Sequence, residues 1–161
     1  MNIRPEIPAD YAEIRSLLLA SFPTADEADL VEQLRTDGDV EISLVAIEGD
    51  QVIGHVVFSV MSAPFRALGL APVAVLADHR RKGVAERLIN TGIEQAKNDG
   101  WEGMFVLGEP DYYQRFGFRA ETAQGFESVY AGPYLMALSL KSEVLPKTSG
   151  RIDYAPAFAG L

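Results

Sequence analysis

Residues 70 to 100 read LAPVAVLADHRRKGVAERLINTGIEQAKNDG, and the rest of the chain is organised around this stretch. Its first part, Ala71 to Ala77, is a short apolar run with the length of a buried strand. Its last part repeats apolar residues at helical spacing from Ala85 to Ala96. A basic turn with one glycine, Arg80 to Val84, joins the two parts. The stretch therefore predicts a buried strand that leads through a tight turn into a helix.

This turn predicts an anion-binding site. The first N–H groups of a helix have no partner within the helix, and the helix dipole adds partial positive charge at the same end. Arg80, Arg81 and Lys82 add cationic side chains there, and Arg can hold two oxygens of one phosphate. Gly83 allows the backbone to approach a ligand where a Cβ would collide. A phosphate group fits such a site, whereas a run of solvated surface charges is the alternative.

The size of the chain favours one domain. With 161 residues, of which 48% are hydrophobic and 23% charged, it can build one compact core and is too short for two ordinary domains. We expect a single domain over residues 1 to 161, with its core in about residues 1 to 140 and a C-terminal extension at 141 to 161. The sequence shows no internal repeat, low-complexity segment or linker.

Charge and hydropathy exclude several classes of partner. A net charge of −9 argues against nucleic acid, because affinity for a phosphate backbone comes from many clustered Lys and Arg side chains. The apolar runs are far shorter than the roughly 18 residues of a membrane span, and the residues after Met1 lack the apolar core of a signal peptide. We therefore expect a soluble, cytoplasmic protein with neither a nucleic-acid nor a membrane partner. Nothing in the sequence excludes a homodimer.

The chain contains no cysteine. This excludes a cysteine nucleophile, a thiolate metal site and any disulfide, and it fits a reducing compartment. Neither histidine, His55 nor His79, has other metal-ligating residues at a suitable spacing. We expect no metal site.

Two helices are predicted directly after a first short strand at residues 2 to 4. The first begins at Pro8 and ends near Phe22. The second begins with a capping box, in which the Thr24 hydroxyl and the Glu27 carboxylate each satisfy a free backbone donor, and it ends at Gly38.

The remaining elements follow from β-rich runs and turn residues. Residues 42 to 47 and 52 to 60 predict an antiparallel hairpin. Gly69 and Pro72 frame the start of the next strand and favour a bulge or a splay there. Further short elements are expected after the central helix: strands at residues 103 to 107, 118 to 120 and 134 to 140, and a helix at residues 110 to 116 that stops at Gly117. A crossover through the central helix makes the strand before it and the strand at 103 to 107 parallel.

This order of elements closely resembles the GCN5-related N-acetyltransferase (GNAT) superfamily, and within it the bacterial group of predicted N-acetyltransferases. The superfamily signature is Gln or Arg, two residues, Gly, one residue, then Gly or Ala, and here Arg80, Gly83 and Ala85 meet it. Residues 113 to 118, Tyr-Gln-Arg-Phe-Gly-Phe, add to the resemblance, which covers roughly residues 1 to 140. It implies an α/β fold with a mixed, mostly antiparallel sheet of about six or seven strands, helices on both faces, and a splay between strands 4 and 5.

The resemblance also implies acetyl-coenzyme A, or another acyl-coenzyme A, as co-substrate. The pyrophosphate would lie on the basic turn, and the pantetheine arm would meet main-chain groups of Val73 and Val75. The side chains of these valines would at the same time belong to the core. The full set of residues expected to hold the cofactor is Val73, Ala74, Val75, Arg80, Arg81, Lys82, Gly83, Val84 and Ala85.

Tyr113 occupies the position where many family members have the tyrosine that protonates the departing coenzyme A thiolate. A phenol, with a reference pKa of about 10, stays neutral at working pH and can give a proton to a thiolate. Sequence alone does not separate Tyr113 from its neighbour Tyr112, and an aromatic that packs the short helix onto the sheet is the structural alternative.

A base must also remove a proton from the amine acceptor. Glu109, just beyond the strand at residues 103 to 107, is the first candidate, and His55 is the second. Many relatives carry an asparagine where this chain has Gly108, Glu109 and Pro110, so that residue's role does not transfer.

The predicted function is N-acyl transfer from acetyl-coenzyme A to a small-molecule or peptide amine, by direct attack in a ternary complex. The alternative is a catalytically silent acyl-coenzyme A sensor or regulatory module. A nucleotide-binding protein is disfavoured, because the turn has neither the full Walker pattern nor the dinucleotide glycine pattern.

Overall fold

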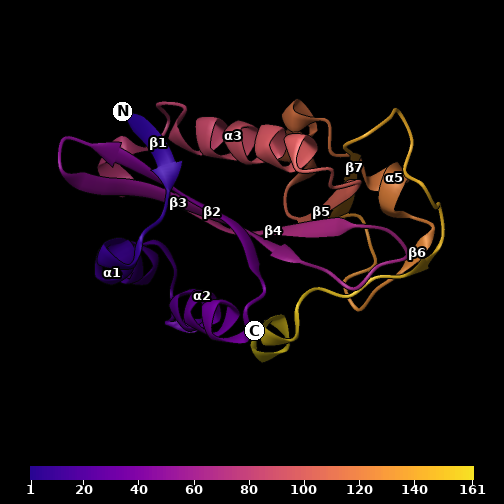
Figure 1. Ribbon diagram of the computed structural model, residues 1–161, viewed down its shortest axis with the longest axis horizontal. Helices are drawn as coiled ribbons and strands as arrows, with labels where there is room; N and C mark the ends of the chain where they lie inside the picture. Colours follow the sequence, from indigo (N-terminus) through magenta and orange to yellow (C-terminus); the bar gives the residue numbers. More distant parts are fainter.

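The computed structural model describes the chain from Met1 to Leu161. Its main sheet has six strands in the order β1-β2-β3-β4-β5-β7, and every neighbouring pair is antiparallel except β4 and β5, which are parallel (Figure 1). The strands are β1 (Asn2–Pro5), β2 (Val40–Glu48), β3 (Gln51–Val60), β4 (Ala67–Val75), β5 (Gly103–Leu107) and β7 (Leu135–Ser139). This mixed, mostly antiparallel sheet confirms the expected fold.

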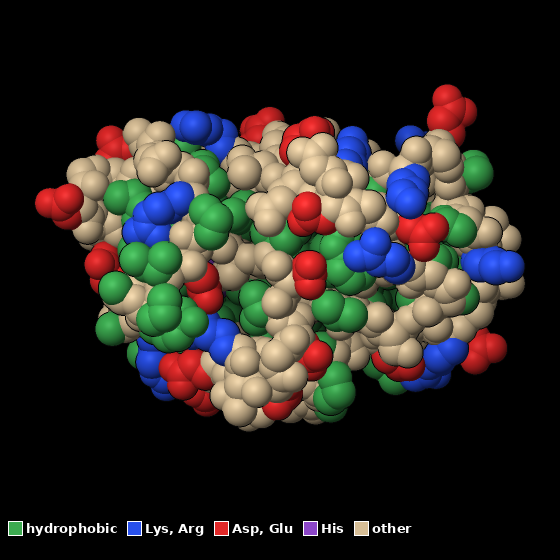
Figure 2. Space-filling model, in the orientation of Figure 1, with side chains coloured by type: hydrophobic (Ala, Val, Ile, Leu, Met, Phe, Trp, Pro, Cys, Tyr) green, Lys and Arg blue, Asp and Glu red, His purple; other side chains and the backbone are tan.

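Helices cover both faces of the sheet (Figure 1). One face carries α1 (Tyr11–Ser21) and α2 (Asp26–Asp37), and the other carries α3 (Val84–Asn98). The shorter helical elements are η1 (Pro8–Asp10), η2 (Ala77–His79), α4 (Pro110–Tyr113), η3 (Gln114–Phe116), α5 (Ala120–Ala123) and η4 (Pro156–Gly160). None of the helices has the length and apolar character needed to cross a membrane. On the face drawn in Figure 2, basic and acidic side chains are interspersed rather than gathered by sign.

Helix α3 packs closely against the sheet because it has a glycine, Gly92, at the point of contact. Gly92 lies over the ring of Phe58 on β3, and a Cβ at that position would collide with the ring. Leu88, Ile89 and Ile93 on the same side of α3 are buried in the same core. This packing of α3 against the sheet also fixes the position of its first turn relative to the end of β4.

Strand β4 separates from β5 partway along its length. Only Ala67 to Gly69 of β4 pair with β5. On its other edge, Val73 faces Val56 of β3 and Leu70 faces Phe58, so β4 has one residue more than β3 in this interval. This β-bulge bends the strand. The splay expected between strands 4 and 5, and the bulge near Pro72, are therefore present.

Two local predictions were wrong. The predicted strand at residues 118 to 120 is reduced to a single bridge between Arg119 and Ala137, because the chain turns directly into helix α5, whose residues favour helix. The predicted capping box is also absent. Helix α2 begins at Asp26 instead of Ala25, and the Thr24 hydroxyl accepts a hydrogen bond from the Asp26 N–H at 3.2 Å. The Glu27 side chain makes no capping bond.

The C-terminal segment from 141 to 161 packs against the rest of the chain. Strand β8 (Gly150–Arg151) pairs with β6 (Phe126–Glu127) in a separate two-stranded sheet. Ile152, Ala155 and Phe158 are buried, and η4 lies beside α2 (Figure 1). The tail therefore adds to the face of the sheet that α1 and α2 cover.

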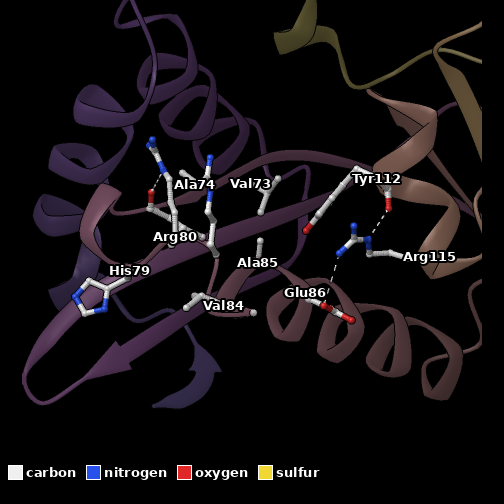
Figure 3. Close-up of a pocket in the computed structure, with 12 residues that line it drawn as sticks. Val73, Ala74, His79, Arg80, Val84, Ala85, Glu86, Tyr112 and Arg115 are labelled. Carbon is white, nitrogen blue, oxygen red and sulfur yellow. Dashed lines mark hydrogen bonds and ion pairs between the residues drawn. The ribbon is translucent and has the colours of Figure 1, made fainter.

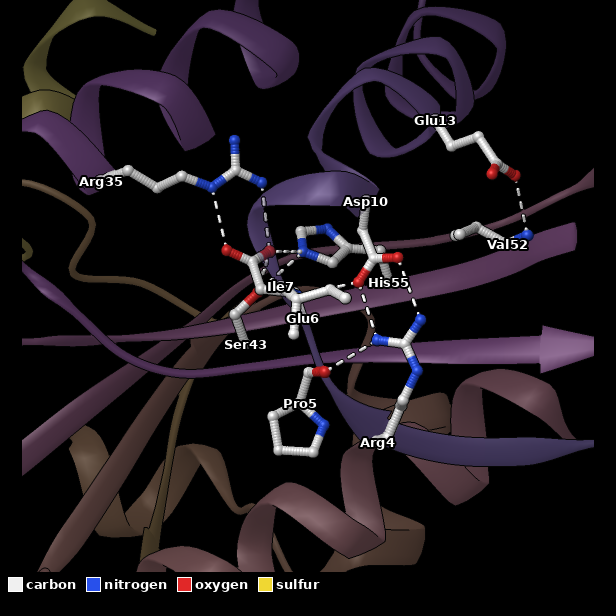
Figure 4. A network of polar contacts seen from close by, with 10 residues as sticks. All are labelled: Arg4, Pro5, Glu6, Ile7, Asp10, Glu13, Arg35, Ser43, Val52 and His55. Atoms are coloured by element: carbon white, nitrogen blue, oxygen red, sulfur yellow. Dashed lines mark hydrogen bonds and ion pairs between the residues drawn. The ribbon is translucent and has the colours of Figure 1, made fainter. Parts of the chain in front are cut away.

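A buried polar network ties this face together (Figure 4). The Glu6 carboxylate accepts hydrogen bonds from Arg35 Nε at 2.9 Å and from the Ser43 hydroxyl at 2.6 Å. His55 Nε2 lies 3.0 Å from Glu6 Oε1 and 2.9 Å from the Ser43 hydroxyl, and the His55 side chain is fully buried. The network joins β2, β3, α2 and the segment after β1, so its charge state bears on stability.

Acidification should weaken the fold through this network. Burial by itself would raise the pKa of Glu6, but hydrogen bonds from His55, Arg35 and Ser43 outweigh it and lower that pKa to about 2. Its stabilising contribution is complete above the ordinary value of 4.5 and is lost as the pH falls toward about 2. Burial lowers the pKa of His55 below its ordinary value of 6.5. As the pH falls, His55 therefore becomes protonated in the unfolded chain while it is still neutral in the folded chain.

We therefore expect the free energy of unfolding in urea to fall between about pH 7 and about pH 4, first through His55 and then through Glu6. A His55→Asn variant should lose the part of this dependence that lies above about pH 5. An unfolding free energy that stays constant from about pH 7 to about pH 4 in the wild type would contradict the role given to the network.

Candidate active site

A cavity of about 590 Å³ lies between the end of β4 and the start of α3 (Figure 3). Every residue that the sequence predicted for the cofactor lines it, except Lys82. The complete lining is Val73, Ala74, Val75, His79, Arg80, Arg81, Gly83, Val84, Ala85, Glu86, Tyr112 and Arg115. The structure thus brings the end of the central strand and the basic turn to one open cavity.

The turn presents a row of free backbone donors to this cavity. Arg81 and Gly83 both have left-handed backbone, with φ of 62° and 79°. None of the N–H groups of residues 81 to 86 donates to a backbone carbonyl, because the first bond at this end of α3 runs from Arg87 N to Gly83 O. Successive free N–H groups at a helix N-terminus form a concave site for an anion.

Arg80 holds the turn against the strand. Its Nε donates a hydrogen bond to the Val75 carbonyl at 3.0 Å (Figure 3). The rest of the guanidinium makes no ion pair with an acidic side chain. Arg80 therefore both fixes the turn and leaves donors for a ligand.

The free edge of β4 continues this site. Leu76 N donates to Ile53 O on β3 at 2.8 Å. In an antiparallel pair, alternate residues point their N–H and C=O groups to opposite edges, so Val73 and Val75 turn theirs away from β3. Strand β5 has already separated at this level, since its pairing with β4 ends at Gly69. The main-chain groups of Val73 and Val75 therefore face the splay.

Aromatic and charged side chains from beyond β5 form the opposite wall. The Arg115 guanidinium lies 4.4 Å from the centre of the Tyr112 ring, and its Nη1 is 3.9 Å from Glu86 Oε2 in the first turn of α3 (Figure 3). Sequence reasoning missed both Arg115 and Glu86 as lining residues. Arg115 lies within the segment at residues 113 to 118 that carried the family resemblance, but its partner on α3 is visible only in the fold.

A second cavity, of about 280 Å³, lies further back along β4. It is lined by Phe22, Glu27, Leu30, Leu70, Ala71, Pro72, Val73, Leu107, Tyr113 and Leu161. Val73 lines both cavities, so both border the strand at the splay. Residues from α2 and the C-terminal tail close this second cavity, so sequence spacing could not have shown it.

The structure separates the two adjacent tyrosines. Tyr112 lines the first cavity and Tyr113 lines the second. Burial, with a smaller contribution from Tyr112, raises the pKa of Tyr113 to about 12. The Tyr113 phenol is therefore protonated at neutral pH, so it can donate a proton in a reaction but cannot serve as the initial base.

Neither sequence-predicted base lines a described cavity. Glu109 is exposed at the start of α4, where its carbonyl accepts hydrogen bonds from the N–H groups of Tyr112 and Tyr113 at 3.1 Å each. His55 is buried in the polar network beneath α1 and α2. Glu27, which the sequence assigned to a helix cap, is the carboxylate that does line the second cavity. No cluster of three His, Cys, Asp or Glu side chains could hold a metal ion.

Residues 11 to 118 match the sequence model of the acetyltransferase (GNAT) family. This match spans more than half of the chain, and it falls on the same strands, turn and helix that build the first cavity. The chain belongs to the GNAT acetyltransferase family, as the element order and the turn signature predicted.

Relatives similar over nearly the whole chain are named as N-acetyltransferases. The chain is 34% identical to the uncharacterized N-acetyltransferase YhbS of Escherichia coli K12, over 98% of each chain. The crystal structure of YhbS in complex with coenzyme A superimposes with a TM-score of 0.92 at 33% identity, over 98% of this chain and 91% of that one. A GNAT acetyltransferase from Brucella melitensis in complex with acetyl-coenzyme A gives a TM-score of 0.81 at 31% identity, over 98% and 97%.

Proposed function

We propose that this protein transfers an acetyl group from acetyl-coenzyme A to an amine, by direct attack in a ternary complex. The observation that carries this proposal is that Val73 lines two cavities, one bordered by the free N–H groups of the turn and the other by Tyr113. Such an arrangement lets a donor and an acceptor arrive from opposite sides of one reacting carbon. Residues 1 to 161 act as one acetyltransferase domain, since the tail supplies part of the acceptor cavity.

The donor occupies the first cavity. Its pyrophosphate accepts hydrogen bonds from the free N–H groups of residues 81 to 86, with Arg80 and Arg81 beside it, and Lys82 adds charge from outside the cavity. The pantetheine arm runs along the free edge of β4, where its amides pair with Val73 and Val75. The coenzyme A and acetyl-coenzyme A complexes of the two similar proteins support this assignment.

The direction of the strand supports a position for the thioester. From the turn, the free edge of β4 runs back from Val75 through Val73 toward Leu70. The second cavity lies at this far end, so a pantetheine arm that runs past Val73 would bring the thioester to this cavity. Tyr113 lines the second cavity and Tyr112 does not, which favours Tyr113 as the acid.

The residues then supply three functions in the reaction. A free N–H on the edge of β4 polarises the thioester carbonyl as the amine attacks it. The carbon–sulfur bond breaks, and the Tyr113 hydroxyl gives its proton to the thiolate. Glu109, the base that the sequence predicted, is exposed and lines neither cavity, so it would reach the amine only through solvent.

A Gly83→Val variant tests the donor site. No atom lies within 4 Å of a Cβ built at Gly83, so the new side chain would project into the space assigned to the ligand. We expect the Kd for coenzyme A, measured by calorimetry, to rise at least about tenfold. Gly49→Val is the matched control, because Gly49 has a similar φ of 59° and equally open surroundings in a distant hairpin turn. Equal affinities of Gly83→Val and wild type would show that the turn does not hold the pyrophosphate.

A Tyr113→Phe variant tests the acid. With acetyl-coenzyme A and a panel of primary amines, we expect kcat for thiol release to fall about 100-fold, while the Kd for acetyl-coenzyme A stays at its wild-type value. Tyr134→Phe, at an exposed tyrosine, is the control. If Tyr112→Phe loses this activity and Tyr113→Phe keeps it, the two roles are reversed. If the wild type binds acetyl-coenzyme A and acetylates none of the amines, the protein is a sensor instead of an enzyme.

A further inference from the structure

We propose that the Glu27 carboxylate binds the ammonium group of the acceptor and takes its proton, and that the acceptor is a primary amine with a compact apolar substituent. This inference rests on the proposed acyl transfer and adds to it the base and the chemical class of the acceptor. It concerns the second cavity, behind Val73.

Glu27 is a carboxylate without a partner. Its Oε1 atom is buried and accepts no hydrogen bond, and its side chain forms no ion pair. It lies in the first turn of α2, where the helix dipole favours a negative charge. A buried carboxylate oxygen normally has a donor or a cation beside it. A cationic group of a ligand in this cavity would supply the partner that the protein does not give to Glu27 Oε1.

The helix start does not account for Glu27. In a capping box the carboxylate would bond the backbone N–H at the start of the helix, and this chain has the sequence pattern for it. Helix α2 begins one residue too late for that bond, and Thr24 instead accepts from the Asp26 N–H. The Glu27 side chain therefore makes no capping hydrogen bond and instead lines the second cavity.

The rest of the cavity is apolar. Apart from Glu27 and the Tyr113 hydroxyl, its side chains carry no polar group: Phe22, Leu30, Leu70, Ala71, Pro72, Val73, Leu107 and Leu161. No Lys or Arg lines it, so an acceptor that carries a carboxylate near its amine would find no cation there and would face Glu27. With a volume of about 280 Å³, the cavity suits a compact apolar group attached to one ammonium.

Glu27 and Tyr113 line the same cavity, which lets them divide the proton transfers. The ammonium gives one proton to the Glu27 carboxylate, and the neutral nitrogen attacks the thioester carbon. As the carbon–sulfur bond breaks, the sulfur takes the Tyr113 proton, and the phenolate recovers a proton from the nitrogen of the new amide. Glu27 then releases its proton to solvent. The products are the amide, coenzyme A thiol and one proton, which balances the reaction.

The first test is equilibrium binding to the coenzyme A-loaded protein, which needs no turnover. The probes are 2-phenylethylamine and 3-phenylpropionate, which have similar shapes and opposite charges. We expect the wild type to bind the amine and not the acid, and Glu27→Gln to bind the amine at least about tenfold more weakly. The matched control is Asp26→Asn, which removes an exposed carboxylate from the same helical turn and should bind the amine like the wild type. Equal binding of the two probes to the wild type, or no loss in Glu27→Gln, would overturn the inference.

The second test is the pH dependence of acetyl transfer to 2-phenylethylamine. Near neutral pH, kcat/KM of Glu27→Gln should be about 100-fold lower than that of the wild type. The difference should shrink as the pH rises toward about 10, because more of the amine then arrives already deprotonated. A purely structural role for Glu27 would give a difference that does not depend on pH, and that result would overturn the assignment as base.

The two tests separate failure of this inference from failure of the proposed function. If the wild type acetylates the amine and Glu27→Gln does so at the same rate, Glu27 is not the base but the protein is still an acetyltransferase. If the wild type binds both the amine and acetyl-coenzyme A without transfer, the proposed function is wrong, and the binding data alone decide whether Glu27 holds the ammonium.

Discussion

The separation of β4 from β5 after Gly69 is the constraint on which the site depends. An extra residue in β4, in the bulge near Pro72, turns the strand away from its parallel neighbour, so the main-chain groups on the free edge at Val73 and Val75 have no strand partner. Of these, the Val75 carbonyl accepts a hydrogen bond from Arg80. Unpaired backbone groups in a buried strand need other partners. One stretch of backbone thereby becomes the shared wall of two cavities, and Val73 belongs to both.

The two faces of the sheet contribute different parts to this wall. On one face, the contact between Gly92 and Phe58 positions α3 so that the free N–H groups at its start lie beside the end of β4. On the other face, the buried contacts of Glu6 with Arg35 and His55 anchor α2, whose first turn carries Glu27. Donor and acceptor would therefore be held by opposite layers of the fold and meet at its open edge.

Local sequence patterns predicted what local forces decide. The apolar strand, the basic turn at Gly83, the periodic helix after it and the hairpin were all recognisable, because each is fixed by neighbouring residues. The sequence also identified all but one of the residues that line the first cavity on β4 and the turn. The sequence could not predict the second cavity, because its lining residues Glu27, Leu70 and Tyr113 come from distant segments of the chain. Because α2 begins one residue later than the sequence predicted, the Glu27 carboxylate lines a cavity instead of capping the helix.

The most direct test of this account is a crystal structure with a bisubstrate conjugate, in which an acetyl linker joins the sulfur of coenzyme A to the nitrogen of 2-phenylethylamine. We predict that the pyrophosphate lies on the N–H groups of residues 81 to 86 and the pantetheine arm along Val73 and Val75. The phenylethyl group should lie between Phe22 and Leu107, with its nitrogen facing Glu27. A phenylethyl group bound outside the cavity behind Val73, or a pyrophosphate away from the turn, would contradict it.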